Sequence, residues 1–325
     1  MNAPRRIVSL ISSATEILFL IGAGRRVVGV SHECDFPSEV AVLPRLTRSL
    51  VDAAAASRAI DEQVGALASN QSTLYAIDVE RVIELAPDLI ITQAQCDVCA
   101  VRYEDVVSAV RGAPSLAHAQ IVALNPRSLA DLFDDVARIA AAVGDPASGQ
   151  RALAGLHERV ADVQAKTKSL APSRIPRVAC LEWIDPPMLA ANWTPELVEM
   201  AGGEAGLAAP GEHSTYANWD AIVRYDPQVV VIMPCGFDLE RAIEESQVLP
   251  RTPGWSQLSA VREGCVFAAD GNAYFNRSGP RLVDSLEILA HLFHPELFAL
   301  EPHLGERAWR RLETRRDALV PAAAK

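Results

Sequence analysis

The stretch RIVSL at residues 6–10, followed by ATEILFLIGAG at residues 14–24, decides the fold that we predict for this chain. The short apolar run predicts a buried strand, and the longer stretch predicts a helix that ends at its glycines. The second half of the chain repeats the pattern, with RVACL at 177–181 and PELVEMAGG at 195–203. Each half therefore predicts a unit that begins with a strand and a glycine-terminated helix.

Both halves also contain a second shared pattern, a helix followed by a proline and an apolar strand. It reads VIELAPDLII at residues 82–91 and AIVRYDPQVVVI at residues 221–232. Short apolar strands that alternate with helices predict parallel sheets covered on both faces. We predict an α/β fold of two Rossmann-like lobes, with the ligand in a cleft where the lobes meet.

A helical stretch separates the two halves. Ser128 and Asp131 open it, apolar residues continue it at helical spacing to about residue 170, and a break falls at Gly144-Asp145-Pro146. We predict a long backbone helix that joins the lobes. The expected organisation is an N-terminal α/β lobe at 1–126, a connecting helix at 127–171, a C-terminal α/β lobe at 172–302 and a peripheral helical tail at 303–325.

Composition excludes several classes of function. The formal net charge of −11 argues against binding to nucleic acid or to anionic membrane surfaces. No stretch approaches the roughly 20 apolar residues of a membrane span. Ser13-x-x-Glu16 predicts a capping box at the start of a helix, so we expect no cleaved signal here. The expected location is cytoplasmic, or periplasmic if translation starts further upstream.

Ligands of parallel α/β sheets gather beyond the carboxyl ends of the strands. The segments that follow five of the predicted strands are rich in aromatic, cysteine, histidine and carboxylate side chains. Trp193 and Tyr274 are favoured as ligand contacts because both neighbour polar residues, and Arg281 lies at a helix start where an anionic partner would explain it. The further candidates in these segments are Cys34, Phe36, Gln95, Trp183 and Phe275.

The cysteines allow three interpretations. Cys96 and Cys99, with Cys235, Cys34 and His32, could form a metal site of thiolates and imidazole. The pair Cys96 and Cys99 could instead be a redox dithiol, or these cysteines could lie in loops without a shared role. In a reducing compartment a disulfide framework is not expected.

Sequence motifs of several common enzymes are absent. There is no nucleophile elbow, no Walker loop and no dinucleotide fingerprint, and Gly22-Ala23-Gly24 ends a helix rather than beginning one. We therefore expect a binding protein rather than an enzyme.

The motifs at residues 6–30 and 85–90, together with those at 186–187, 196–203 and 279–281, strongly resemble one known family. The chain resembles the helical-backbone (class III) substrate-binding proteins of ABC importers, within their cobalamin-binding branch. The resemblance covers residues 6–293 and implies two α/β lobes that hold a ligand between them.

The resemblance also implies site residues. Tyr75, Tyr274 and Phe275 match positions where aromatic side chains contact the corrin, and residues 35–37 match another. Members carry a glutamate on each lobe that engages permease arginines; Glu80 matches the first, and Asn276 or a neighbour stands where the second is expected. The loops with Cys96, Cys99, Cys235 and His32 depart from the family pattern.

Two hypotheses follow. The first is a non-enzymatic binding protein for cobalamin or a related corrinoid or metal chelate, with a possible ABC permease as partner through Glu80. A thiolate or imidazole could coordinate the corrinoid cobalt directly. The second is a cytoplasmic metalloprotein or thiol redox enzyme that uses a metal ion or reactive thiols at Cys96, Cys99, Cys235 and His32.

Overall fold

The computed structural model describes residues 3–70, 73–94, 100–305 and 307–313 of the 325-residue chain. The chain divides into two compact units. Unit 1 comprises Met1–His157 together with Ser278–Pro280, and unit 2 comprises Glu158–Arg277 together with Arg281–Lys325. The predicted boundaries at 126/127 and 171/172 do not coincide with this division, because the first part of the predicted connector packs within unit 1.

Unit 1 contains a parallel sheet with the strand order β2-β1-β5-β6. All four strands were predicted as apolar runs, and their residues are mostly buried because helices cover both faces. The strands are β1 (Ile7–Ser9), β2 (Val27–Val30), β5 (Leu89–Gln93) and β6 (Gln120–Leu124). A separate antiparallel pair, β3 (Thr47–Ser49) and β4 (Tyr75–Ile77), lies between β2 and β5 in the sequence.

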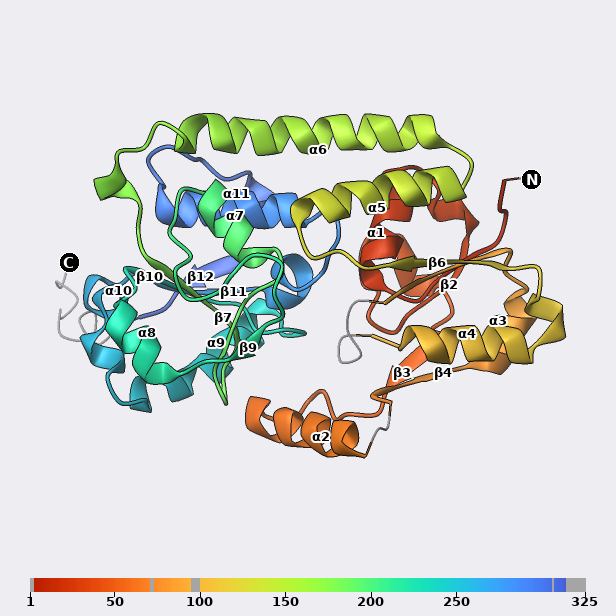
Figure 1. The fold of residues 1–325 in the computed structure, drawn as a ribbon, viewed down its shortest axis with the longest axis horizontal. Coiled ribbons are helices and arrows are strands. Elements are labelled where there is room, and N and C mark those ends of the chain that lie inside the picture. Colours follow the sequence, from red (N-terminus) through yellow and green to blue (C-terminus); the bar gives the residue numbers. More distant parts are fainter. Residues whose placement is uncertain (1–2, 71–72, 95–99, 306, 314–325) are drawn as a thin grey trace, which may run out of the picture. The chain divides into compact units, whose positions relative to one another are not determined.

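Helices cover both faces of the unit 1 sheet (Figure 1). On one face, Val8, Leu10 and Ile90 pack against Val82 and Val106 of α3 and α4. On the other face lie α1 and α5, which pack against each other. The helices are α1 (Ser12–Leu20), α2 (Ser57–Ser69), α3 (Val79–Leu85), α4 (Tyr103–Gly112) and α5 (Leu129–Ala142), with 3₁₀ turns at Gly24–Arg26, Ser38–Val42 and Pro114–Leu116.

The observed ends of the helices can be compared with the helix starts and ends that we predicted from short sequence motifs. The capping box at Ser13 is wrong, since Ile11 is the N-cap of α1 without a side-chain cap, and Ser13 lies buried inside the first turn. The predicted glycine end is confirmed: Gly22 has φ of 79°, and Ala23 N–H donates to the Leu18 carbonyl at 2.7 Å. The predicted helix start at Ser128 and Asp131 is also confirmed and is a capping box: the Ser128 hydroxyl accepts from Asp131 N–H at 3.1 Å, and the Asp131 carboxylate accepts from Ser128 N–H at 3.0 Å.

Unit 2 contains a mixed sheet with the strand order β12-β11-β10-β7-β8-β9. Its parallel core of β11, β10 and β7 was predicted, whereas the antiparallel strands on both sides were not. The strands are β7 (Val178–Trp183), β8 (Met188–Leu189), β9 (Thr215–Tyr216), β10 (Val229–Ile232), β11 (Val266–Ala269) and β12 (Trp309–Arg311). β12 corrects the prediction of a helical tail, because these residues pair with β11.

Helices α8 and α10 pack against one face of this sheet, and α7 and α11, which contact each other, lie on the other (Figure 1). The hydrophobic core on the α8 and α10 side of the sheet includes Leu181, Ile222, Ile232 and Trp255. The helices are α7 (Thr194–Met200), α8 (Trp219–Tyr225), α9 (Leu239–Glu245), α10 (Ser259–Glu263) and α11 (Leu282–Phe293). 3₁₀ turns lie at Pro172–Arg174, Ser246–Arg251, Trp255–Gln257 and Pro302–Leu304, and a π-helical turn lies at Gly271–Phe275.

The long helix α6 (Pro146–Thr167) begins after the predicted break and carries the chain from unit 1 into unit 2. Its buried residues Leu156, Val160 and Val163 follow helical spacing. Among the described residues, no helix combines the length and the apolar character that a bilayer crossing requires.

Candidate functional site

In unit 1, the loop after β2 is held by the hydroxyl group of Thr47. The oxygen Thr47 Oγ1 lies 2.7 Å from His32 Nδ1 and 3.0 Å from Ser31 Oγ, and it accepts a hydrogen bond from His32 N–H at 3.0 Å. Arg45 adds a second restraint, since its guanidinium donates to the carbonyls of Ser31 and Cys34. The loop at residues 31–34 is therefore held by side chains from the segment that enters β3.

Two rings meet at this edge of unit 1. The ring centroids of His32 and Tyr75 are 5.4 Å apart at an interplanar angle of 42°. Phe36, further along the same loop, is 47% exposed, which is unusual for a phenylalanine. The structure thus brings together His32 and Tyr75, two residues that the sequence analysis had placed in different candidate sites.

Cys34 lies in the core of unit 1. Its side chain is 1% exposed, and its Sγ lies 3.1 Å from Thr15 Oγ1. A thiol enclosed in this way packs as a small apolar group, so we do not include Cys34 in the candidate ligand surface.

In unit 2, the segments after β7, β10 and β11 lie side by side. Cys235 N–H donates to the Glu182 carbonyl at 3.0 Å, and Asn272 N–H donates to the Phe237 carbonyl at 3.0 Å. Gly271 allows this arrangement, because a Cβ at that position would lie 2.2 Å from the Pro234 carbonyl oxygen. The segments that follow these three strands therefore adjoin one another in unit 2.

Aromatic side chains line these strand ends. The rings of Trp183 and Phe237 are 5.1 Å apart, and the Arg241 guanidinium lies 3.7 Å from the Phe237 ring centroid. The indole Nε1 of Trp183 has no hydrogen-bond partner among the residues that the structure describes. Beyond β11, the Arg281 guanidinium lies 5.7 Å from the ring of Tyr274, in the range of a cation–π contact.

Trp193 and Phe275, both predicted ligand contacts, are core residues of unit 2. They are 7% and 1% exposed. The Trp193 Nε1–H donates to the Phe275 carbonyl at 2.8 Å, which satisfies the polar group of the indole. Since neither side chain presents a face to solvent, the structure favours a packing role for both.

Two carboxyl groups at the strand ends of unit 2 have perturbed acidity. Burial raises the pKa of Glu182. The hydrogen bonds that its carboxylate accepts from Ser214 Oγ and from the backbone at Ala191 act in the opposite direction, but their effect is smaller. Burial also raises the pKa of Asp270, against the hydrogen bond from Ala273 N–H. Both carboxylates accept hydrogen bonds that organise the neighbouring loops, so their first role is to hold the strand-end segments.

The predicted metal site gains no support from the described part of the chain. There, no three histidine, cysteine or carboxylate side chains come together as metal ligands would. Cys96, Cys99 and Gln95 lie outside the described residues. Cys235 is partly exposed at the strand ends of unit 2, and His32 belongs to unit 1.

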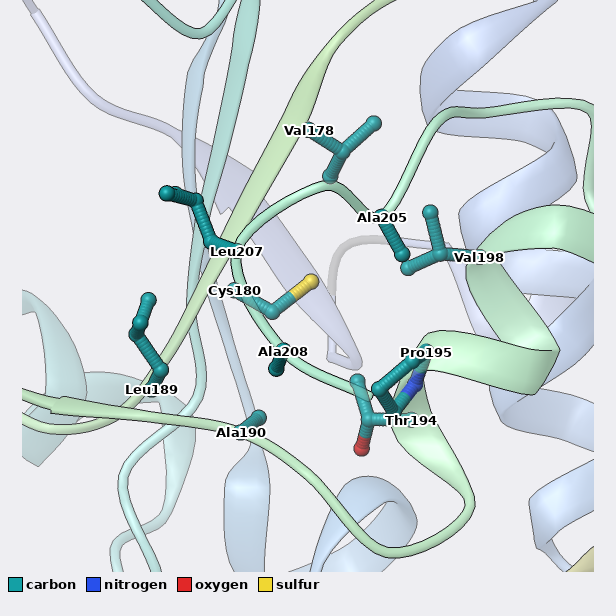
Figure 2. A pocket seen from close by; sticks show the side chains of 10 residues that line it. All are labelled: Val178, Cys180, Leu189, Ala190, Thr194, Pro195, Val198, Ala205, Leu207 and Ala208. Atoms are coloured by element: carbon teal, nitrogen blue, oxygen red, sulfur yellow. The ribbon is translucent and has the colours of Figure 1, made fainter. Parts of the chain in front are cut away.

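A small apolar cavity lies within unit 2 (Figure 2). Cys180, Leu189, Thr194 and Val198 are among its lining residues, and burial raises the pKa of the Cys180 thiol to about 12. Its volume is about 20 Å³, which is room for about one water molecule. Sites for organic ligands span roughly 300–1,000 Å³, so this cavity is a packing defect and not a ligand site.

The repeat places an acidic residue in unit 2 that the sequence analysis missed. α3 and α8 each have a side-chain N-cap, Asp78 and Asn218, and each ends at a left-handed residue that precedes a proline. Glu80 and Asp220 both occupy the second helical position and are both exposed. Asp220, rather than Asn276, is therefore the counterpart of Glu80, and aligning the two patterns APDL and DPQV would have found it.

Comparison with known proteins identifies the family. A model of the periplasmic binding protein family matches residues 7–273. The chain belongs to the periplasmic binding protein family. Among curated members, it is 25% identical over 301 residues to the uncharacterized ABC transporter substrate-binding lipoprotein YvrC of Bacillus subtilis, covering 91% of this chain and 82% of that protein. It is 23% identical to the vitamin B12-binding protein of Vibrio cholerae, covering 87% and 86%.

Solved structures share the fold. The periplasmic heme-binding protein RhuT from Roseiflexus sp. RS-1 superposes with a TM-score of 0.66 at 22% identity, covering 90% of this chain and 99% of RhuT. This likeness confirms the predicted fold of two α/β lobes with parallel sheets. The family match confirms the resemblance to substrate-binding proteins of ABC importers, and nothing supports the alternative of a redox enzyme.

Proposed function

We propose that this periplasmic binding protein binds a corrinoid, with cobalamin as the first candidate, and delivers it to an ABC permease. The observation that carries the proposal is the set of rings beyond the strand ends. His32 and Tyr75 meet in unit 1, and Trp183 lies against Phe237 in unit 2. Aromatic rings pack well on the flat faces of a large macrocycle.

The relatives support a macrocyclic metal chelate as the ligand class. One curated relative is named for vitamin B12 and one solved neighbour for heme. Corrins and porphyrins are both broad, flat and metal-bearing, so rings at the strand ends suit either. We favour the corrinoid because the B12-named relative is similar in sequence along 87% of this chain, whereas the likeness to the heme-named neighbour, at 22% identity, is one of fold. A single ligand shared by both units stays a prediction.

Titration of the purified chain tests the ligand class. Cyanocobalamin and hemin are added separately at about 10 μM, above the Kd of a micromolar complex, and binding is followed by absorbance and calorimetry. We expect heat and saturation with cyanocobalamin. Absence of both signals with both chelates would remove the proposal, and saturation with hemin alone would replace the corrinoid by a porphyrin.

Two variants tie the binding to the strand ends. Tyr75→Ala and Trp183→Ala should each weaken cyanocobalamin binding about tenfold or more, as expected when a ring contact is lost. The matched control is Tyr225→Ala, since Tyr225 ends α8 at the opposite edge of the unit 2 sheet, before β10. Thermal unfolding confirms that each variant is folded.

We also propose that Glu80 and Asp220 contact the permease. Both are exposed acids at equivalent helix positions, one on each unit. Pull-down of the permease by variants in which Glu80 or Asp220 is replaced by lysine tests this role, and we expect these variants to capture less permease. The cytoplasmic location expected from the N-terminal sequence stays a prediction, and it conflicts with delivery to an importer, so cell fractionation decides between the two.

A further inference from the structure

One helix of unit 1 lies outside the layers of its parallel sheet. Helices α1, α3, α4 and α5 cover the two faces of that sheet, whereas α2 lies beyond the end of the β3–β4 pair (Figure 1). Of residues 57–69, all of which the structure describes, Ser57 alone is buried. A helix that packs on a core normally buries a whole stripe of side chains. The core of unit 1 therefore does not account for α2.

The place of α2 in the sequence connects it to the candidate ligand surface. The chain leaves β3 after Ser49 and enters β4 at Tyr75, and these two residues are paired. A loop of about two to five residues would join two such strands, yet the connection here runs from residue 50 to residue 74. Long connections in compact domains are commonly binding loops or lids. This one begins and ends where Tyr75 meets His32.

Hydrogen bonds orient α2 relative to the strand pair. Gln63 of α2 accepts a hydrogen bond at Oε1 from Asp52 N–H at 2.9 Å, and Asp52 Oδ1 accepts from Ala54 N–H at 3.0 Å. At the base of the connection, Leu50 N–H donates to the Leu74 carbonyl at 2.9 Å. The segment that enters α2 is thus tied both to the helix and to the strand pair.

α2 carries an apolar stripe that is only partly buried. Ile60, Val64 and Leu67 follow one another at spacings of four and three residues, so they lie on one side of the helix. Each of them keeps part of its surface exposed. Leu50, where the connection leaves β3, is 41% exposed. Since apolar surface is stabilised when it leaves water, this stripe is suited to contact with a large ligand that has apolar surface.

We propose that α2 is a further part of the ligand site and covers the macrocyclic chelate that binds beside His32 and Tyr75. This inference rests on the proposed function. The stripe of Ile60, Val64 and Leu67 lies against the macrocycle and shields the ring contacts from water. Corrins and porphyrins both offer a broad apolar ring, so the assignment is to this class of chelate. A cover of this kind slows the departure of the ligand more than it speeds its arrival.

Backbone hydrogen exchange of the wild-type chain tests the cover. Exchange is measured without ligand, with saturating cyanocobalamin and, separately, with saturating hemin. We expect the amides of α2 to exchange about tenfold more slowly or less when the chelate is bound, because contact with the ligand suppresses local opening of the helix. α3, which packs in the core of unit 1, is the internal reference. Slower exchange with hemin alone assigns the same cover to a porphyrin.

Variants connect the residence time of the ligand to the stripe. The double variant Val64→Ser/Leu67→Ser should speed dissociation of the bound chelate about tenfold and change its association rate by less than about twofold. The matched control is Ala66→Ser, which introduces the same side chain at an exposed position of α2 outside the stripe. Stopped-flow absorbance measures both rates, and thermal unfolding confirms that each variant is folded.

The two proposals fail in different ways. If neither cyanocobalamin nor hemin binds, the proposed function is wrong, and the role of α2 is wrong with it. If a chelate binds while α2 exchanges as in the free chain, or if the double variant releases the chelate at the wild-type rate, the cover is wrong and the binding function stands. Exchange of the wild-type chain decides this even if a variant does not fold.

Discussion

The two units hold the loops beyond their parallel strands by different means. Unit 1 uses side chains: the hydroxyl of Thr47 and the guanidinium of Arg45 hold the loop after β2. Unit 2 adds close backbone contacts to the side-chain hydrogen bonds of Glu182 and Asp270: Gly271 lies against the carbonyls of Met233 and Pro234, and main-chain hydrogen bonds join the three strand ends. A side-chain restraint can be removed by a single substitution. The close backbone contacts of unit 2 cannot be removed without also lowering the stability of that unit.

The strongest test of this contrast compares two glycines. In unit 2, a Cβ at position 271 would lie 2.2 Å from one carbonyl oxygen and 2.6 Å from another. In unit 1, a Cβ at Gly29 would meet the side-chain tips of Leu46 and Leu85 at 2.6 and 2.8 Å. Gly271→Ala should therefore reduce the free energy of unfolding by about 3 kcal/mol or more, and Gly29→Ala by about 1 kcal/mol. Urea unfolding measures both, and equal losses would end the contrast.

Each unit also carries a largely enclosed acid on a helix: Asp135 of unit 1 is 2% exposed, and the Asp284 side chain of unit 2 is 13% exposed. Asp284 of unit 2 pairs with Arg159 at 2.6 Å. Asp135 of unit 1 is bonded through Oδ1 to Arg138 at 2.9 Å, while its Oδ2 has no partner among the described residues. Burial raises the pKa of Asp135 to about 6, although Arg138 opposes the shift.

Asp135→Asn should stabilise the chain at pH 7. A carboxyl group with pKa about 6 when folded and 3.8 when unfolded favours folding below pH 4 and loses that contribution as the pH rises to 6. The loss is about 3 kcal/mol, so the variant should gain about 2–3 kcal/mol at pH 7 and little at pH 4. Chemical unfolding at the two pH values measures this gain. The exposed neighbour Asp134 provides the control Asp134→Asn, and a gain that does not depend on pH would contradict the assignment.

The smallest expected effects are on permease binding and concern two acidic residues at equivalent positions of the two units. Glu80 and Asp220 occupy the same position on α3 and α8. Glu80→Lys and Asp220→Lys should each weaken permease binding by about 1–2 kcal/mol, a factor of 5–30, with cyanocobalamin binding unchanged. Glu84→Lys, on the exposed side of α3, is the control. An effect at only one of the two acids would mean that the units do not dock alike.

Local sequence signals predicted much of the fold. The seven parallel strands appear as apolar runs because both faces of each are covered, and the glycine end of α1 and the capping box of α5 depend on residues close in sequence. The antiparallel strands β8 and β9 have two residues each, and β12 reads Trp-Arg-Arg, so none of them forms an apolar run of its own. Only pairing with longer neighbours makes them strands.

The candidate site also has features that could be predicted from the sequence and features that depend on the tertiary structure. The sequence by itself determined that aromatic and polar residues follow the strands, since strand ends and residue types can both be recognised along the chain. Only the tertiary structure decided which of them face solvent: Trp193 and Phe275 satisfy each other within the core. Likewise, Thr47 and Tyr75 reach His32 from 15 and 43 residues away. Burial and such distant contacts arise from packing of the whole unit, which no local pattern encodes.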